Sequence, residues 1–509
     1  MSSRSSSASS PTRASWPRRR LRSSRRTARR PPSSPRRSRS STPSSPSWRS
    51  RPDTPVAQLG YEEALVRVAA ALPFGINPSL EGIAALCHAL GRPHEAFRVV
   101  QVTGTNGKTS TARLTEALLR AHGVRTGLYT SPELERYPER FEVAGSVATD
   151  GDVARALSAV LEAAEVLRPK AFGTPAGFTE FELTTAAALW LFAHSGVEVA
   201  VLEVGMGGRW DATSVASPSV AVITGVGLDH TAILGDTHEA IAAEKAAIIR
   251  RGSVAVLGPG TRETEGVFIE AARAAGAPVH RVHEGLGTGE GSAAVDVGYE
   301  LVSTPQEPRG ATVLDVRGAE GFYPALAVQA PAYQAANVAT AVAAVEAALG
   351  NTLDVQSTRD ALLEVTLPGR FEIVSDEPLV VVDGSHNPQA AAVLAESIAA
   401  AWPDAARRPV VLLGVLADKD AAGIVRELAP VASRLVACAP ESPRALDAAE
   451  LAAVACRVTG GAVEYHETLL EALDALLGDA GVREGGLVVT GSLTTAGQAR
   501  NALRDDSAT

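Results

Sequence analysis

Lysine is nearly absent from this 509-residue sequence, which holds Lys108, Lys170, Lys245 and Lys419 against 44 arginines. Arginine therefore supplies most of the positive charge, and each remaining lysine has a stronger claim to a chemical role. The lysine ammonium is compact, acts as a point charge toward phosphate, and can lose its proton and react. This scarcity makes all four lysines candidates and assigns a role to none of them.

Cysteine and long apolar runs are also scarce. Three cysteines are too few and too far apart for a disulfide framework or a zinc site. No run approaches the roughly 18 apolar residues of a membrane span. With 45% hydrophobic and 21% charged residues, the sequence predicts a globular cytoplasmic protein of two or three domains with no membrane partner.

Acidic residues are nearly missing from the first 55 positions. These hold 15 arginines and one acid, Asp53, so their charge is +14 while the other 454 residues carry −23. Such a segment cannot bury a core, and we expect residues 1–55 to form a disordered tail. A solvated extension or a mis-assigned start is the favoured interpretation, with nucleic-acid binding and a transit peptide as alternatives. Only Trp16 and Trp48 could stack on bases, so a nucleic-acid partner is not expected.

From Tyr61 onward, short β-branched runs ending in glycine alternate with Ala/Leu-rich helical segments. This alternation predicts an α/β fold whose first domain holds a P-loop-type, doubly wound, mainly parallel sheet. It weakens between 280 and 330, where loops and antiparallel strands are expected, and restarts near Leu367. We expect an ATP-binding central domain over 56–366, a smaller Rossmann-like α/β domain over 367–503, and a short tail over 504–509. Segments that carry the expected strands are 97–104, 197–205, 219–227, 253–260, 378–388, 409–420, 433–440 and 486–493.

The segment VVQVTGTNGKTSTARLTEALL, starting at Val99, joins a strand to a helix through a glycine-rich turn. Backbone N–H groups and the helix dipole would face an anion there, and Lys108 adds positive charge. Thr109 follows the lysine where a hydroxyl usually meets Mg²⁺. The full P-loop pattern is not met, because Val102 stands where its first glycine should be. The segment predicts phosphate binding and leaves the reaction open.

Three further segments place polar side chains just after expected strands. Glu203 ends one strand, Asp229 and His230 follow another, and Ser131 lies in a loop after a third, while Lys245 lies on a helix. Ligands bind at the carboxyl ends of such strands. Alone, Glu203 could be a solvated acid and His230 a core or capping histidine. Together they are candidates for binding a hard cation through oxygen atoms and one imidazole.

Seven motifs then occur in order: TGTNGKTS, TSP-x-L-x-x-x-x-ER, EVGMGGRWDAT, GLDHT-x-x-LGDT-x-x-x-IA-x-EKA-x-II, LPGRFE, DGSHNP and GVLADKD. Through them, residues 60–500 resemble the folylpolyglutamate synthase/dihydrofolate synthase family of the Mur-ligase-like superfamily. The resemblance implies an ATP-dependent amide ligase, in which ATP phosphorylates the carboxylate of dihydropteroate or a folate and L-glutamate attacks the acyl phosphate. It implies two Mg²⁺ sites and a carbamylated Lys245, and it admits K⁺ as a further cofactor. We expect a monomer.

The resemblance also assigns residues to roles. The expected catalytic residues are Lys245, His230 and Lys108. One Mg²⁺ would be bound by Ser131 and Glu203 with Thr109 nearby, and the second by Glu203 and His230. The expected ATP-binding residues are Gly104, Thr105, Asn106, Gly107, Lys108, Thr109, Ser110, Asn337, Arg370, Asp383 and His386, with Asn337 at the adenine and Arg370 and Asp383 closing from the second domain. The expected substrate-binding residues are Phe181, Asp211, Ala212 and Thr213.

Other interpretations stay open at this point. Lys245 could be a helix-surface lysine paired with Glu244, Lys419 fits the GVLADKD motif without a clear task, and Lys170 is interpreted as surface charge. The chain could be a bifunctional synthase or a single-activity relative, including a Mur-type ligase for another acid. It could also be a non-enzymatic P-loop protein. A peptidoglycan-type ligase is disfavoured because only about 45 residues separate Thr54 from Val99, too few for a preceding UDP-binding domain.

Three positions depart from the family pattern. Glu133 replaces the histidine common in the TSPHL motif, Ser214 replaces the asparagine of DATN, and Gly82 stands where an arginine often follows Leu-Glu in the pterin-side segment. The candidate Mg²⁺ and ATP residues are unaffected. We therefore expect that any functional difference between this chain and the family lies in its affinity for the substrate.

Deletion of residues 1–55 should leave both ligase activity and the thermal midpoint unchanged, because this segment has too little apolar content to pack against the rest of the chain. Thermal unfolding and turnover of the truncated protein, compared with the full chain, provide the measurement. A midpoint lowered by several degrees would contradict the interpretation.

Overall fold

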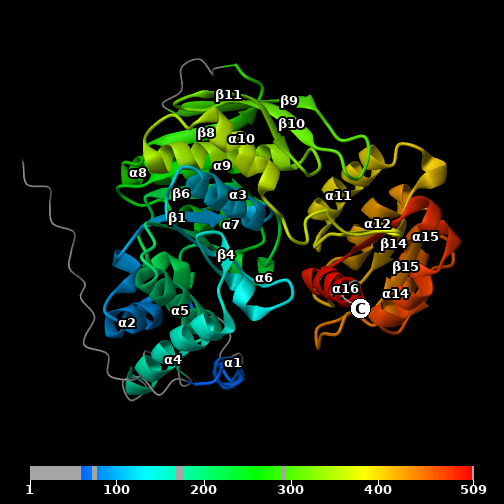
Figure 1. The fold of residues 1–509 in the computed structure, drawn as a ribbon, viewed down its shortest axis with the longest axis horizontal. Coiled ribbons are helices and arrows are strands. Elements are labelled where there is room, and N and C mark those ends of the chain that lie inside the picture. The colour runs from blue at the N-terminus through cyan, green and yellow to red at the C-terminus, as the bar shows by residue number, and fades with distance from the viewer. Residues whose placement is uncertain (1–58, 72–76, 168–176, 288–293, 507–509) are drawn as a thin grey trace, which may run out of the picture. The chain divides into compact units, whose positions relative to one another are not determined.

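The computed structural model describes residues 59–71, 77–167, 177–287 and 294–506, and Figure 1 labels their helices and strands. The expected tail at 1–55, Lys170 and residues 507–509 lie outside these ranges. Within them, no helix is both long enough and apolar enough to cross a membrane.

The first sheet has eleven strands, in the order β11-β10-β9-β8-β7-β6-β1-β5-β2-β3-β4. Their bounds are β1 (Arg98–Thr103), β2 (Thr126–Tyr129), β3 (Phe141–Val143), β4 (Ser146–Val147), β5 (Val199–Glu203), β6 (Val220–Gly225), β7 (Val254–Gly260), β8 (Val279–Glu284), β9 (Val295–Ser303), β10 (Thr312–Arg317) and β11 (Phe322–Val328). The run from β9 to β2 is parallel, and antiparallel strands flank it on both sides. The mainly parallel sheet is confirmed. Antiparallel pairing in 280–330 holds for β9, β10 and β11, whereas β8 pairs in parallel with both of its neighbours.

Helices cover both faces of this sheet (Figure 1). They are α1 (Tyr61–Ala69), α2 (Glu81–Ala89), α3 (Lys108–Ala121), α4 (Asp150–Leu167), α5 (Glu180–His194), α6 (Thr231–Leu234), α7 (His238–Ala246), α8 (Glu265–Ala275), α9 (Gln334–Leu349) and α10 (Val355–Glu364). Side chains alternate across a strand, and β1 follows this rule. Val100 and Val102 pack into the core that contains α3 and α9, while Val99 packs into the core that contains α4 and α5. Burial on both faces explains why every residue of β1 after Arg98 is buried.

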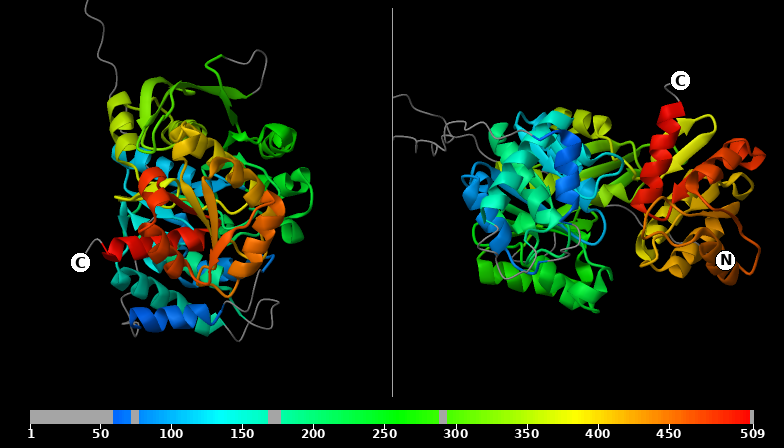
Figure 2. Two further views of the ribbon diagram at one scale, coloured as in Figure 1. Left: turned by 90° about the vertical axis from the view of Figure 1, so that its right-hand side faces the viewer. Right: turned by 90° about the horizontal axis from the view of Figure 1, so that it is seen from below.

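The second sheet has six strands, in the order β12-β13-β17-β14-β15-β16. They are β12 (Glu372–Asp376), β13 (Leu379–Val382), β14 (Val410–Leu413), β15 (Arg434–Cys438), β16 (Glu464–His466) and β17 (Leu487–Thr490). All pairings are parallel except that of β12 with β13. Its helices are α11 (Pro388–Ala401), α12 (Ala421–Leu428), α13 (Ala448–Thr459), α14 (Leu469–Leu477), α15 (Ala480–Gly485) and α16 (Leu493–Asp506). Figure 2 shows these helices on both sides of the orange strands, as expected for a second α/β domain.

Strand order places the candidate residues near one another. Because β1 lies between β5 and β6, the segments that follow these three strands leave the same edge of the sheet. Gly104 follows β1, Glu203 ends β5, and Val226 follows β6. In the second sheet, Asp383 follows β13 next to the end of β17. Both groups lie at the carboxyl ends of parallel strands, where open α/β sheets bind ligands.

Candidate functional site

The turn between β1 and α3 forms an anion cradle. Gly107 immediately precedes α3 and has a left-handed backbone with φ of 82°, a conformation that glycine adopts without steric cost. A Cβ at this position would lie 2.7 Å from Asn337 Oδ1 on α9. The turn therefore needs glycine for its backbone and for its close approach to α9, and it leaves the first N–H groups of α3 facing outward.

Two of the four lysines meet at this turn. The Lys108 ammonium donates to the Gly104 and Thr105 carbonyls, both at 3.1 Å, and the Lys245 ammonium donates to the same Gly104 carbonyl at 2.9 Å. Lys245 is 3% exposed. Burial, with the nearby positive charge of Lys108, lowers the pKa of Lys245 to about 7. A large fraction of its amine is therefore neutral near physiological pH.

The surface interpretation of Lys245 is wrong. Lys245 is buried, and the carboxylate of Glu244 accepts instead from Arg209 Nε at 2.9 Å. The sequence could not distinguish the two faces of α7, because this short helix carries polar residues around much of its circumference.

Glu203 accepts hydrogen bonds from two other candidate ligand residues, Thr109 and Ser131. Thr109 Oγ1 donates to its two carboxylate oxygens at 2.9 and 3.1 Å, and the Ser131 backbone N–H donates to it as well. Glu203 is 1% exposed. Burial raises the pKa of Glu203, and the charge of Lys108 opposes this rise. The carboxylate and the Thr109 hydroxyl supply oxygen atoms, which are the ligands that a hard cation prefers.

His230 lies at the rim of this group. Its backbone is left-handed, with φ of 51°, and its side chain is 47% exposed beside Asp229. Burial lowers the pKa of His230, and Asp229 opposes this change. Among the described residues, no three His, Cys, Asp or Glu side chains are grouped to hold a metal. The structure thus groups Thr109, Ser131 and Glu203 and leaves His230 outside their hydrogen bonds.

The remaining residues of the turn bond to α9 and to the β6 end. Asn337 Oδ1 accepts from Thr111 at 3.2 Å, and Gln334 Nε2 donates to Ser110 Oγ at 3.2 Å. Thr105 Oγ1 accepts from the Gly227 N–H at 2.9 Å. These bonds fix the turn between two elements.

From the second domain, Asp383 is held in a tight turn. Its carboxylate accepts from the Phe371 N–H at 2.8 Å and from the N–H and hydroxyl of Ser385 at 2.9 and 2.5 Å. Arg370 Nη1 donates to the Gly369 carbonyl at 3.0 Å, and the Arg370 charge acts on both Asp383 and Glu203. Arg370 thus lies close enough to both carboxylates to act on either domain.

His386 is partly buried in the same motif. Its Nδ1 lies 2.9 Å from the Gly384 carbonyl, and burial lowers the pKa of His386 to about 4. Its ring is therefore neutral at physiological pH.

Polar contacts that the motifs did not predict join the two domains at this site. Asn106 donates to Gln389 at 3.0 Å and accepts from Asn387 at 3.2 Å. The Lys419 ammonium lies 3.0 Å from Asp229 Oδ1, with both side chains largely buried. Lys419 thereby gains a partner, which neither its rarity as a lysine nor its place in GVLADKD had named. Gln389 directly follows DGSHNP but carries no signal of its own.

The expected substrate residues lie on α5 and in the loop after β5. The centroids of the Phe181 and Tyr129 rings lie 6.1 Å apart. A Cβ on Gly205 would lie 2.8 Å from Phe181 Cζ. Asp211 caps a short 3₁₀ helix and accepts from the Thr213 N–H at 3.0 Å. Ala212 and Thr213 are buried. Asp211 and Thr213 therefore shape the loop after β5, whatever else they contact.

Comparison with known proteins agrees with this geometry. Residues 102–285 match the Mur ligase middle domain, and residues 369–493 match the Mur ligase glutamate ligase domain. The dihydrofolate synthase/folylpolyglutamate synthase of Mycobacterium tuberculosis is 36% identical over 85% of this chain and 91% of its own length. The dihydrofolate synthase/folylpolyglutamate synthase of Escherichia coli is 33% identical over 82% of this chain and 90% of its own length. The chain belongs to the dihydrofolate synthase/folylpolyglutamate synthase family. It is an ATP-dependent glutamate ligase.

Solved structures of the dihydrofolate synthase/folylpolyglutamate synthase family share the fold. Mycobacterium tuberculosis folylpolyglutamate synthase, complexed with ADP and AMPPCP, superimposes with a TM-score of 0.78 at 36% identity, covering 87% of this chain and 99% of that one. E. coli FolC, in complex with DHPP and ADP, superimposes with a TM-score of 0.75 at 30% identity. The match covers 89% of this chain and 100% of that one. The relatives thus hold adenine nucleotides on this fold.

The three departures from the family pattern acquire local explanations. Glu133 accepts from Arg140 at 2.5 Å, and Ser214 donates to the Gly208 carbonyl at 2.6 Å. A Cβ at Gly82 would lie 2.3 Å from Glu182 Oε1. In this chain Glu182 already accepts from the Thr179 N–H at 2.9 Å, so a larger residue at 82 would have to displace it.

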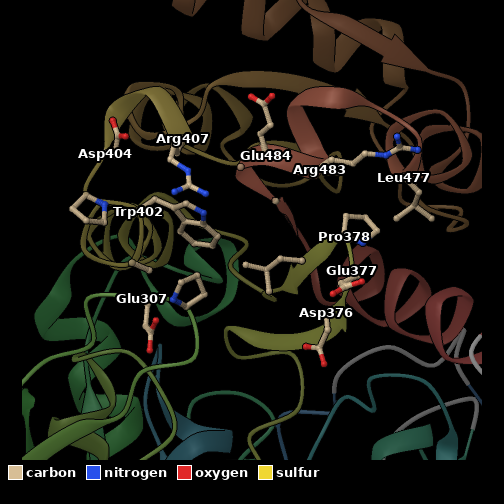
Figure 3. A pocket seen from close by; sticks show the side chains of 16 residues that line it. Glu307, Asp376, Glu377, Pro378, Trp402, Asp404, Arg407, Leu477, Arg483 and Glu484 are labelled. Atoms are coloured by element: carbon tan, nitrogen blue, oxygen red, sulfur yellow. The ribbon is translucent and has the colours of Figure 1, made fainter.

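A cavity of about 810 Å³, shown in Figure 3, is lined by none of the candidate site residues. Trp402, Arg407, Asp376, Leu379 and Gly486 are among its lining residues. Leu379 begins β13 and Gly486 precedes β17, so this cavity lies at the amino ends of the second sheet. The ligand residues gather at the carboxyl ends, and the cavity volume therefore does not mark the active site.

Gly107→Ala should weaken ATP binding at least about tenfold, a loss of ~1.4 kcal/mol, because its Cβ would displace Asn337 and tilt the turn. Gly123→Ala is the matched control, since Gly123 also has positive φ, at 78°, but has nothing within 4 Å of its Cβ. Both variants should lose about 1–2 kcal/mol of folding stability from the left-handed backbone. Calorimetric titration with ATP measures the difference, and equal ATP affinities in the two variants would contradict the prediction.

Proposed function

We propose that this glutamate ligase of the dihydrofolate synthase/folylpolyglutamate synthase family joins L-glutamate to dihydropteroate, to folates, or to both, through an acyl phosphate. The observation that carries the proposal is the convergence of Lys108 and the buried Lys245 on the Gly104 carbonyl next to the Glu203 carboxylate. A positive cradle beside a dry carboxylate suits a nucleotide phosphate and its accompanying cation. We propose domain limits of 56–366 and 367–503 for the two halves that contribute residues.

The turn residues Gly104 to Ser110 would hold the ATP phosphates, with Lys108 as a point charge. Lys108 now donates to two carbonyls of its own turn, and a phosphate oxygen would replace these acceptors. Asn337, from α9, would lie at the nucleotide as well. The acyl phosphate then forms when the substrate carboxylate attacks the γ-phosphorus and ADP leaves. The neutral amine of glutamate attacks the acyl carbon next, and phosphate leaves as the amide forms.

Mg²⁺ fits the residues around Glu203. Thr109, Ser131 and Glu203 would hold one ion, and His230 with Glu203 a second after a movement of its exposed side chain. When bound, Mg²⁺ neutralises charge on the transferring phosphoryl group. A K⁺ requirement stays a prediction, and replacing K⁺ with Na⁺ in the assay tests it. Monomeric state and cytoplasmic location also stay predictions, the first of which sedimentation can test.

Lys245 would act as a carbamate. Its neutral amine adds to the carbon of CO₂, a proton is released, and an anionic oxygen donor replaces an ammonium. Burial favours this reaction because it lowers the amine pKa to about 7. The carbamate would also remove the repulsion between two cations that share one carbonyl. Arginine could not take this role, which accounts for a lysine here in an arginine-rich chain.

The substrate acid is tested by assaying ATP hydrolysis with dihydropteroate and with a reduced folate, each with and without L-glutamate. Glutamate-dependent turnover with both acids supports a bifunctional synthase, and turnover with one supports a single-activity relative. Turnover with neither would contradict the proposal and favour a Mur-type ligase for another acid.

Lys245→Arg should lower turnover by on the order of 100-fold or more, because it puts a fixed cation where an oxygen donor belongs and weakens stabilisation of the phosphoryl group. Lys245→Ala should also be impaired, and added acetate should restore part of its activity by occupying the vacated position. Steady-state kinetics of both variants give the measurement. Wild-type turnover in Lys245→Arg would rule out the carbamate.

Arg370→Ala should lower kcat by on the order of 100-fold with little change in thermal midpoint, because Arg370 acts from the second domain on a site that must exclude water. Arg483→Ala is the control, an exposed arginine of the same domain that lines the distant cavity. If both variants turned over at the wild-type rate, the assigned contact between the domains would be wrong.

A further inference from the structure

Gly497 occupies an unfavourable position for a glycine, inside the long helix α16. Glycine there costs about 1 kcal/mol relative to alanine. A Cβ on Gly497 would lie 1.9 Å from the Leu134 carbonyl oxygen, which belongs to the loop after β2. The glycine thus lets backbone of the first domain approach the helix more closely than any side chain would allow.

The Leu134 side chain enters the second domain at the same place. It packs against the apolar core of that domain, which includes Val382, Val489 and Ala496. A Cβ on Gly369 would lie 3.0 Å from Leu134 Cδ1. Gly369 and Gly497 therefore line two sides of a socket for Leu134. At both positions the absence of a side chain leaves the space that Leu134 occupies.

An ion-pair chain flanks the socket. Arg500 Nη1 lies 2.6 Å from Glu135 Oε1 of the loop, and Arg500 Nε lies 2.9 Å from Glu372 Oε1 of β12. The side chains of Arg500 and Glu135 are only 9% and 11% exposed. A pair this dry is costly to break, because the remaining charge stays buried without a partner.

The loop is also ordered from within. Glu139 Oε2 accepts from the Leu134 and Glu135 N–H groups at 3.0 and 3.1 Å. Arg140 Nε donates to Glu133 at 2.5 Å, and Arg140 Nη1 donates to Glu180 on α5 at 2.8 Å. A displacement of Leu134 would therefore be transmitted along a stiff segment rather than absorbed by it.

Both ends of this contact lead to the active site. Ser131, at the start of the loop, donates its N–H to Glu203. On the other side, Glu372 Oε2 accepts from the Gly369 N–H at 2.8 Å, and Gly369 directly precedes Arg370. The contact thus connects the candidate cation site of one domain with the nucleotide-closing arginine of the other.

We propose that Leu134 and Glu135 form a docking key, and that its seating against Gly369, Gly497 and Arg500 sets the position of Ser131 relative to Arg370. Leu134, Glu135 and Arg500 are positioning residues, since they act through Ser131 and Arg370. The link to turnover rests on the proposed function, whereas the docking itself does not.

Gly497→Ala tests the socket, with Gly266→Ala as the matched control. Gly266 lies near the start of α8, is exposed and has nothing within 4 Å of its Cβ. In Gly497→Ala, amide hydrogen exchange of a peptide covering 131–140 should accelerate about tenfold or more, since docking protects it. kcat should fall about tenfold or more through misplacement of reacting groups, with KM for the pterin acid within about twofold of wild type. Gly266→Ala should change none of these.

Glu135→Gln, Arg500→Gln and their combination test the ion pair without relying on the socket. The double variant should lose less kcat than the product of the single losses, by about threefold or more, and Arg500→Lys should retain more activity than Arg500→Gln. Independent losses, or equal exchange of 131–140 in Gly497→Ala and Gly266→Ala, would overturn the docking key. If the wild-type chain turned over neither pterin acid, the proposed function would fail while the exchange measurement would still decide the docking.

Discussion

The site depends on one constraint, the meeting of two lysine ammonium groups at the Gly104 carbonyl. That carbonyl directly follows the central strand β1, so its position is fixed by burial of the strand on both faces. Lys108 reaches it from the first turn of α3, and Lys245 reaches it from α7, 141 residues away in the chain. The Lys108 ammonium and the partly charged Lys245 amine share one oxygen and favour an anion that can join them. This unfavourable arrangement prepares the turn for phosphate and lowers the pKa of the Lys245 amine.

Glu203 balances that charge from the neighbouring strand. It is buried and bonded to donors from the turn and from the loop after β2. Burial raises its pKa, and the charge of Lys108 and the hydrogen bonds from Thr109 and Ser131 oppose this rise. The charge of Glu203 on β5 is therefore balanced by groups on two other segments, the first turn of α3 and the loop after β2. A shift in any one of them would change the protonation of the others, which explains why the loop carrying Ser131 needs rigid support.

The second domain supplies that support as well as Arg370. Its contacts with the first domain are of two kinds. Amide and ion-pair contacts of Asn106, Gln389, Asp229 and Lys419 lie at the carboxyl ends of the strands. The Leu134 contact lies on the side of α16 and is apolar and close. The polar contacts can exchange with ligand or water, whereas the leucine socket accepts only one geometry.

Local sequence was enough to predict the parallel sheets and to place the glycine-rich turn and the candidate residues at the strand ends, because β-branched runs, glycine turns and helix starts act over a few residues. It was also enough to mark all four lysines as candidates by their rarity. It could not decide the environment of Lys245, because α7 is too short for its polar pattern to define a buried face. It could not find Gly497, since a glycine in a helix carries no sign of what lies against it. The Glu135–Arg500 pair was equally hidden, as its partners are 365 residues apart. Burial, shared acceptors and close backbone approach arise only when distant segments pack, and so the tertiary structure alone decided them.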